Sequence, residues 1–233
     1  MNARFFSATR LTAIGDEVQL PQAEAHHFLN VLRGKVGDQI GLLDGCGQEA
    51  TAEVIVARKS AVTVRVTELR TVDREPRRKL TLAVSLPKGD RQKILVEKLT
   101  ELGVQRLVPL RTERSVAQPT DGALERLEQH VMAACKQSGR TRKMEIALPL
   151  DIAQLATWNQ PTVRLVAHPG QGEETALEQI GSDEIAVAVG PEGGFTDEEV
   201  AVLVTSGWQA LQLGPRLLRI ETAAIAVAAK WLL

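Results

Sequence analysis

The fold is decided by residues 185–195, which read IAVAVGPEGGF. The run begins with small and β-branched apolar residues, a pattern typical of a strand buried on both faces of a parallel sheet. It breaks at a glycine-rich turn, and Thr196 followed three residues later by Glu199 predicts the capped start of a helix. Because loops at the carboxyl ends of parallel strands bind ligands in α/β sheets, we expect a ligand site here. A tight strand-to-helix turn without a ligand is the alternative.

A second stretch, residues 211–224, reads LQLGPRLLRIETAA and has a similar arrangement. A short apolar run ends at a Gly-Pro pair, and three polar residues, Arg219, Glu221 and Thr222, precede an alanine-rich helix. From residue 79 onward strands and helices alternate, which predicts a mostly parallel α/β sheet. The expected strands cover residues 80–86, 106–110, 164–167, 185–189 and 210–213, and the expected helices cover residues 90–102, 122–138, 196–205 and 221–233.

The first 70 residues have a different pattern. Short strand-like segments, such as residues 54–56 and 62–66, are separated by glycines, which predicts a compact β-barrel. One helix is expected over residues 21–33, because apolar residues recur there at helical spacing. Residues 72–78, VDREPRR, are charged and contain a proline, so we interpret them as the linker between two domains.

The composition narrows the class of protein. The chain has 233 residues, and its hydrophobic fraction of 44% is ample for a buried core. No apolar run is long enough to cross a bilayer and the amino terminus carries no apolar signal segment, so we expect a cytoplasmic protein without membrane contact. Two cysteines and four histidines, without metal-binding spacing, predict neither a disulfide framework nor a metal site.

The net charge is −1, but the charges are distributed unevenly along the chain. Residues 1–72 are neutral overall, residues 73–150 hold 16 Lys/Arg against 10 Asp/Glu, and residues 151–233 hold 4 against 11. A basic middle segment is expected if one face of the protein meets RNA phosphates. A solvated surface whose charges happen to segregate is the alternative.

The stretches GPEGGF and LGPRLLRIETA, taken together, resemble the paired signature of the SPOUT-class RNA methyltransferases. More narrowly they resemble the RsmE family, which methylates N3 of a uridine in 16S ribosomal RNA. Other motifs similar to that family follow in the same order over nearly the whole chain: RFF at residues 4–6, HHFLNVLR at 26–33, LPKGDR at 86–91, EKLTELG at 97–103, ERS at 113–115 and QSGR at 137–140. Each motif alone is weak, whereas the ordered set is specific.

The resemblance implies a fold that periodicity cannot predict, because true knots are exceptions to the usual topological rules. We expect a carboxyl-terminal SPOUT α/β domain with a deep trefoil knot over residues 72–233, preceded by a small PUA-like RNA-binding β-barrel domain over residues 1–71. The resemblance also implies a homodimer.

The implied function is transfer of a methyl group from S-adenosyl-L-methionine to N3 of a specific uridine in 16S ribosomal RNA of the small ribosomal subunit. A non-catalytic RNA-binding ribosome-assembly factor with a SPOUT fold is the alternative. A nucleotide-binding metabolic enzyme is disfavoured, because neither of the common glycine-rich phosphate-binding motifs is present.

The resemblance further implies a cofactor site formed by loops that begin at His168-Pro169-Gly170, at Gly190 and at Leu213. Gly193 and Gly194 are expected to leave space that any side chain would fill. The implied cofactor-binding residues are Leu165, His168, Gly190, Pro191, Glu192, Gly193, Gly194, Leu213, Gly214, Leu218 and Thr222.

Three residues are candidates for catalysis. Arg219 would stabilise the negative charge that develops on uracil, and Glu221 would orient that arginine or, less favourably, take the proton. Arg140 is a second cationic candidate, supplied by the partner subunit. A structural ion pair between Arg219 and Glu221 is the alternative, and the group that accepts the N3 proton stays open. The implied RNA contacts are Arg4, Arg33, Lys88, Arg91 and Arg114.

Overall fold

The computed structural model describes the chain except for residues 1–2, 59–60, 118, 160, 162 and 169–179. The backbone divides into two compact units. Unit 1 comprises residues 1–75 and 132–143, and unit 2 comprises residues 76–131 and 144–233. Each unit has its own sheet and its own hydrophobic core, so we describe each by itself.

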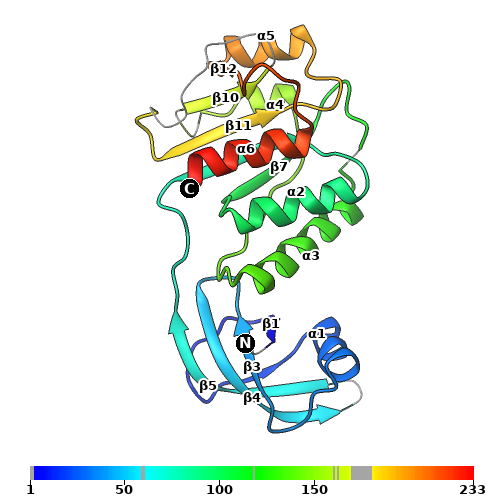
Figure 1. Cartoon of the computed structure of the whole chain (residues 1–233), viewed down its shortest axis with the longest axis vertical. Helices are drawn as coiled ribbons and strands as arrows, with labels where there is room; N and C mark the ends of the chain where they lie inside the picture. The colour runs from blue at the N-terminus through cyan, green and yellow to red at the C-terminus, as the bar shows by residue number, and fades with distance from the viewer. Residues whose placement is uncertain (1–2, 59–60, 118, 160, 162, 169–179) are drawn as a thin grey trace. The chain divides into compact units, whose positions relative to one another are not determined.

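Unit 1 is built on a five-stranded sheet within its described residues. The strands are β1 (Arg4–Phe6), β2 (Glu17–Gln19), β3 (Gln39–Leu43), β4 (Gln48–Arg58) and β5 (Ala61–Thr71). They are arranged in the order β1-β3-β4-β5-β2, and neighbours are antiparallel except for the parallel pair of β1 and β3 (Figure 1). The expected β-rich character of the first part of the chain is confirmed.

The helix expected over residues 21–33 is shorter than predicted. It is α-helical only over α1 (Gln22–His26) and then widens into a π-helical turn, His27–Val31. In this turn the Leu32 N–H donates to the carbonyl of His27 at 3.1 Å. The chain then leaves the helix through Arg33, whose φ of 55° is left-handed. Apolar spacing indicated the helix but not the wider turn, which needs one extra residue.

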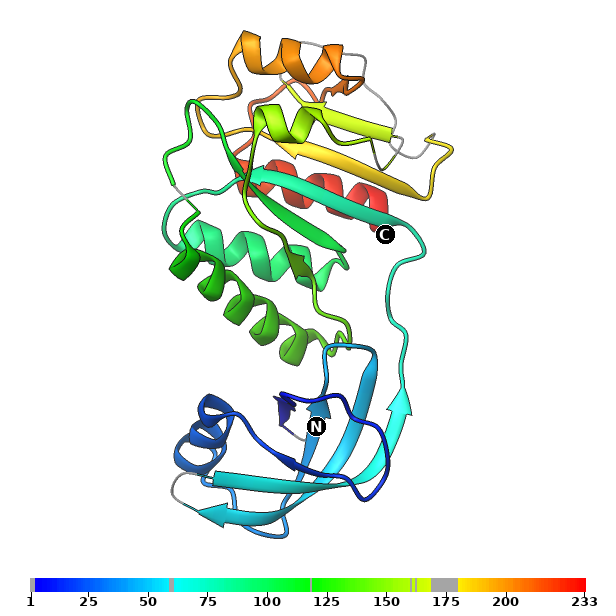
Figure 2. The ribbon, with the colours of Figure 1, turned by 180° about the vertical axis from the view of Figure 1, so that it is seen from behind.

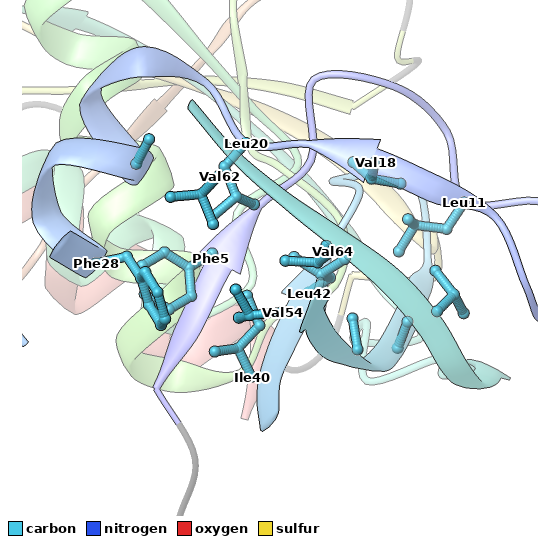
Figure 3. Close-up of a cluster of buried hydrophobic side chains, with 14 residues drawn as sticks. Phe5, Leu11, Val18, Leu20, Phe28, Ile40, Leu42, Val54, Val62 and Val64 are labelled. Atoms are coloured by element: carbon cyan, nitrogen blue, oxygen red, sulfur yellow. The ribbon is translucent and has the colours of Figure 1, made fainter. Parts of the chain in front are cut away.

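Two aromatic rings fill one end of the core of unit 1 (Figure 3). The rings of Phe5 and Phe28 meet edge to face with centroids 5.8 Å apart, a favourable geometry for aromatic pairs. Gly34 lies directly against Phe28, because a Cβ built on this glycine would be 2.1 Å from Cζ of the phenylalanine ring. A glycine at residue 34 therefore lets the chain pass over a buried ring.

Residues 132–143 follow residue 71 by a long stretch of chain but group in space with unit 1. The Thr141 hydroxyl donates to the carbonyl of Val72 at 2.7 Å, and the Gly47 N–H donates to the carbonyl of Thr141 at 3.0 Å. These bonds join segments that are far apart along the chain.

Unit 2 contains a sheet in which every pair of neighbouring strands is parallel, as expected. Its strands are β6 (Lys79–Ser85), β7 (Arg106–Arg111), β8 (Glu145–Ile146), β9 (Leu150–Asp151), β10 (Val163–Ala167), β11 (Glu184–Val189) and β12 (Gln209–Leu211). The order is β12-β10-β11-β6-β7, and the short strands β8 and β9 both pair with β7. After Glu184, all of β11 is buried, which confirms the interpretation of the IAVAV run.

Helices cover both faces of this sheet (Figures 1 and 2). The helices wholly within unit 2 are α2 (Asp90–Glu101), α4 (Ile152–Ala156), α5 (Asp197–Thr205) and α6 (Ile220–Leu232), whereas α3 (Asp121–Ser138) begins in unit 2 and its residues 132–138 belong to unit 1. Helices α2 and α6 pack together, and α6 lies on β6 and β11. Helices α4 and α5 pack on the other face, around a core that includes Phe195 and Trp208.

The end of α6 is anchored to the start of β6. Trp231 is almost fully buried, and its indole N–H donates to the carbonyl of Lys79 at 3.3 Å. The guanidinium of Arg78 lies 4.4 Å from the centre of the same ring, within the range of a cation–π contact.

No helix in the described part of the chain is long and apolar enough to span a membrane. The described residues also contain no cluster of His, Cys, Asp or Glu suited to a metal ion.

We predict that Gly34→Ala destabilises the protein by about 1–3 kcal/mol, the usual cost of overpacking a core. The new methyl group would force the buried ring of Phe28 away from Phe5. Urea unfolding measures the loss. Gly122→Ala is the matched control, because its Cβ meets nothing within 4 Å, and it should be neutral or slightly stabilising. Equal stability of the two variants would contradict the close contact.

Candidate functional site

A cavity of ≈ 260 Å³ lies at the carboxyl ends of β10, β11 and β12, all within unit 2. Its described walls are the carboxyl end of β10 with His168, the loops after β11 and β12, and the first turn of α6. It is therefore at the edge of the sheet where parallel α/β folds bind ligands. The lining residues are Ala167, His168, Val189, Gly190, Pro191, Glu192, Gly193, Gly194, Leu211, Leu213, Gly214, Arg216, Leu217, Leu218, Ile220 and Ala223.

The glycine-rich loop between β11 and α5 is a closed turn. The Gly194 N–H donates to the carbonyl of Pro191 at 2.8 Å, and Gly194 has a φ of 69°. A Cβ on Gly194 would meet nothing within 4 Å, so the space beside this lining residue is open, and the expectation that a side chain there would fill space needed by a ligand stays a prediction. The left-handed backbone of residue 194 also favours glycine. A Cβ on Gly193 would lie 3.2 Å from Cδ of Arg114, so the space there is tight.

The helix after this loop begins as predicted. The Thr196 hydroxyl accepts from the Glu199 N–H at 3.1 Å, and the Glu199 carboxylate accepts from the Thr196 N–H at 2.9 Å. This capping box satisfies two backbone donors at the start of α5. The exit of the glycine-rich loop is therefore fixed by local bonds.

The loop between β12 and α6 gives the cavity an apolar wall. Leu217 is 83% exposed and Leu218 is 37% exposed, so both present apolar surface at the cavity. Among the described lining residues, Glu192, Arg216 and His168 have ionisable side chains, and none is a lysine, serine or threonine. Such a wall suits a ligand with a flat apolar part and no phosphate group.

His168 follows β10 and is held by its own backbone. Its N–H donates to the carbonyl of Leu211 at 3.1 Å, which joins the ends of β10 and β12. Its ring Nδ1 is buried and has no hydrogen-bond partner within the described chain. A buried polar atom of this kind is a natural contact for a ligand. Pro169 and Gly170, expected to continue this loop, lie outside the described residues.

Most of the expected cofactor-binding residues lie together around the cavity. These are His168, Gly190, Pro191, Glu192, Gly193, Gly194, Leu213, Gly214 and Leu218. Leu165 and Thr222 do not line it, since Leu165 is fully buried inside the sheet and Thr222 is exposed in the first turn of α6. The lining also includes Ala167, Val189, Arg216, Ile220 and Ala223, which the sequence did not indicate as site residues.

The catalytic candidates lie in different surroundings. Arg219 is the exposed N-cap residue of α6, between the lining residues Leu218 and Ile220. Glu221 is 8% exposed, and its Oε2 has no hydrogen-bond partner among the described residues. The cation nearest to this oxygen among the described ion pairs is Arg91, with Nη1 at 3.9 Å. Among the described ion pairs, Glu221 therefore pairs with Arg91 and not, as the structural alternative had it, with Arg219.

Arg140 belongs to unit 1 and is buried there. Its Nε and Nη2 donate to the two carboxylate oxygens of Glu75 at 2.9 and 2.5 Å. This two-pronged ion pair, with 6% of the arginine side chain exposed, has the geometry of a structural contact.

The five expected RNA contacts also divide into two groups. Arg33 and Lys88 are exposed, and the described residues give them no hydrogen-bond or ion-pair partner. Arg4 donates to the carbonyl of Lys136 and lies 3.7 Å from Glu49. Arg91 and Arg114 contact the glycine-rich loop, through Glu192 and the carbonyl of Gly193 respectively.

Comparison with known families assigns both parts of the chain. Residues 73–232 match the model of the RNA methyltransferase domain, and residues 20–67 match the model of the RNA methyltransferase PUA domain. Two curated relatives are both ribosomal RNA small subunit methyltransferase E. The protein of Synechocystis sp. is 31% identical over 95% of this chain and 76% of its own length. That of Bacillus subtilis is 32% identical over 86% of this chain and 83% of its own length.

Solved structures agree with this assignment. The ribosomal RNA small subunit methyltransferase E of Neisseria gonorrhoeae, bound to S-adenosylmethionine, superposes with a TM-score of 0.87 at 32% identity, covering 98% of this chain and 96% of its own. A methyltransferase of Legionella pneumophila, also with bound S-adenosylmethionine, gives a TM-score of 0.92 at 30% identity with the same coverage. A mixed α/β fold with a PUA domain and a parallel-sheet methyltransferase domain is thus common to all three, and this chain belongs to the ribosomal RNA small subunit methyltransferase E family of RNA methyltransferases.

Proposed function

We propose that this protein uses S-adenosyl-L-methionine to methylate N3 of one uridine in 16S ribosomal RNA of the small ribosomal subunit. The cavity between the GPEGG and LGP loops is the observation that carries the proposal, because it joins the two stretches that the sequence singled out. Relatives named for small-subunit RNA methylation match over most of the chain, and structural neighbours hold S-adenosylmethionine. Two intact glycine loops around one cavity disfavour a non-catalytic assembly factor.

The lining fits this cofactor. S-adenosylmethionine supplies an electrophilic methyl group on a cationic sulfur and carries no phosphate. The exposed leucines at 217 and 218 offer apolar surface for a flat adenine ring. Backbone groups of the two glycine loops, together with the unpartnered Nδ1 of His168, offer hydrogen bonds for its polar edges.

Arg219 is the residue that we assign to the reaction itself. Methylation at N3 displaces a proton, so negative charge develops on the uracil ring as the proton leaves. A guanidinium beside the cavity stabilises that charge without reorganising, which is the usual basis of electrostatic catalysis. The exposed N-cap position of Arg219, next to the lining residues Leu218 and Ile220, supports this role. The target base is then exposed or flipped out of the RNA before reaction.

Unit 1 and the basic residues Arg33 and Lys88 are proposed to bind RNA. Both side chains are exposed, so their charge is available to phosphates.

We further propose that the carboxyl-terminal segment forms a trefoil knot and that the protein acts as a homodimer in the cytoplasm. Membership of the family supports these points, and the exposed leucines at 217 and 218 offer apolar surface for a subunit contact as well.

We predict that Gly194→Val weakens S-adenosylmethionine binding by about tenfold or more. Valine strongly disfavours the left-handed backbone of residue 194, so the turn closed by Pro191 would open. Calorimetric titration measures the affinity. Gly37→Val is the matched control, because Gly37 has a φ of 91° and open space but lies in unit 1. Equal affinity of the Gly194 variant and wild type would exclude this loop as the cofactor site.

We predict that Arg219→Ala lowers the methyl-transfer rate by about 100- to 1,000-fold while changing cofactor affinity little. The interaction strengthens only as the proton leaves, so its loss acts on the rate rather than on binding. Arg219→Lys keeps the charge but loses the planar fork, so it should restore only part of the rate. Single-turnover methylation of small ribosomal subunits measures these rates. A folded alanine variant that reacts at the wild-type rate would make Arg219 a structural residue.

A further inference from the structure

Two arginines from outside the glycine-rich loop bind consecutive residues of it. Arg91, in the first turn of α2, donates from Nη2 to the carboxylate of Glu192 at 2.8 Å. Arg114, in the segment after β7, donates from Nη1 to the carbonyl of Gly193 at 2.8 Å. Both contacts are charge-assisted, and such hydrogen bonds are stronger than neutral ones. Two side chains from outside the loop therefore hold it in place, in addition to the hydrogen bond between Gly194 and Pro191 within it.

Arg91 also faces a second carboxylate. Its Nη1 is 3.9 Å from Oε2 of Glu221, the buried oxygen that otherwise has no hydrogen-bond partner in the described chain. A buried carboxylate is costly unless a cation compensates it. Arg91 therefore lies between Glu192 on the glycine-rich loop and Glu221 on the first turn of α6, which are both walls of the cavity.

The segment that carries Arg114 is itself braced. The Ser115 hydroxyl accepts from the Thr112 N–H at 2.9 Å and bonds to the hydroxyl of Ser85 at 2.7 Å. The Glu113 N–H donates at 2.9 Å to Glu199, the same carboxylate that caps α5. Arg114 is exposed, but it extends from a fixed segment and its Nη1 is bonded to the carbonyl of Gly193, so it gives the loop a defined support.

We propose that Arg91 and Arg114 are positioning residues, which hold loop 190–194 in the shape that binds the cofactor, rather than RNA contacts. The proposal rests on the assignment of this loop as the cofactor site. Two carboxylates already neutralise the charge of Arg91, and its side chain is only 34% exposed, so little of its charge is available to a phosphate. Lys88, three residues earlier, is exposed without such partners in the described chain and keeps its role as an RNA contact.

The first test compares cofactor and RNA affinities of Arg91→Met, Arg114→Met and the control Lys88→Met. The two arginine variants should bind S-adenosylmethionine about tenfold more weakly, the effect of losing one charge-assisted hydrogen bond. Their affinity for small ribosomal subunits without cofactor should stay unchanged. Lys88→Met should bind cofactor normally and bind subunits more weakly. The slope of log affinity for subunits against log salt concentration should fall by about one, as expected for the loss of one phosphate contact.

A double-mutant cycle separates positioning from a general loss of stability. Arg91→Met should weaken cofactor binding at least as much as Glu192→Gln, because it removes the contact with Glu221 as well, and the double variant should lose no more than Arg91→Met alone. Arg91→Lys should recover part of the affinity. Additive losses, or arginine variants that keep cofactor affinity and lose RNA affinity, would overturn the proposal.

Amide hydrogen exchange without cofactor gives a readout independent of the proposed activity. Amides of residues 190–195 should exchange faster in Arg91→Met and Arg114→Met than in wild type, while amides of β11 should not change. Unchanged exchange in the loop would also overturn the positioning role. If the loop exchanges faster but wild type binds no S-adenosylmethionine, the positioning role stands and the proposed cofactor function fails.

Discussion

The functional cavity depends on the parallel register of three neighbouring strands. Ala167 at the end of β10 is paired with Val189 of β11 on one side and with Leu211 of β12 on the other. These three residues form one row across the sheet, and all three line the cavity. Because the strands end together, His168 after β10 and the loops after β11 and β12 border a common space. A shift of one residue in either pairing would move one loop along the strand direction by about 3.3 Å and disrupt this enclosure.

The same register explains which parts of the site could be predicted from sequence. Buried strands and a capping box are local patterns, so β11, the glycine-rich loop and the start of α5 were predicted correctly. Pairing between distant strands is not local, so sequence patterns do not indicate the contributions of Ala167 and Val189. Leu165, expected at the site, is fully buried and is not among the described lining residues. Helix α4 was also missed, even though Asp151 and Gln154 form a capping box that the sequence contains.

The charge pattern was correctly observed, but it has a second physical cause. Several cations of the basic middle segment pair with anions of the acidic segment inside unit 2. Lys79 bonds to Glu184 at 2.5 Å, and Arg91 bonds to Glu192 at 2.8 Å. The first pair joins the starts of two adjacent strands, since Lys79 and Glu184 are partners in the sheet register. Opposite charge in the two segments therefore contributes to their assembly, and only part of the basic charge is available to RNA.

The cavity can form only late in synthesis, because much of its lining comes from the carboxyl-terminal part of the chain. Residues 211–223 supply Leu211, Leu213 and the whole apolar wall up to Ala223, whereas the five strands of unit 1 lie within the first 71 residues. Since domains fold largely as they emerge from the ribosome, the sheet of unit 1 can form long before the cavity does. A nascent chain that ends at the glycine-rich loop has one wall of the site and no enclosure. Under the proposed function, cofactor capture has to wait for the completion of α6, because a prematurely terminated chain has the sheet of unit 1 but no enclosed cavity.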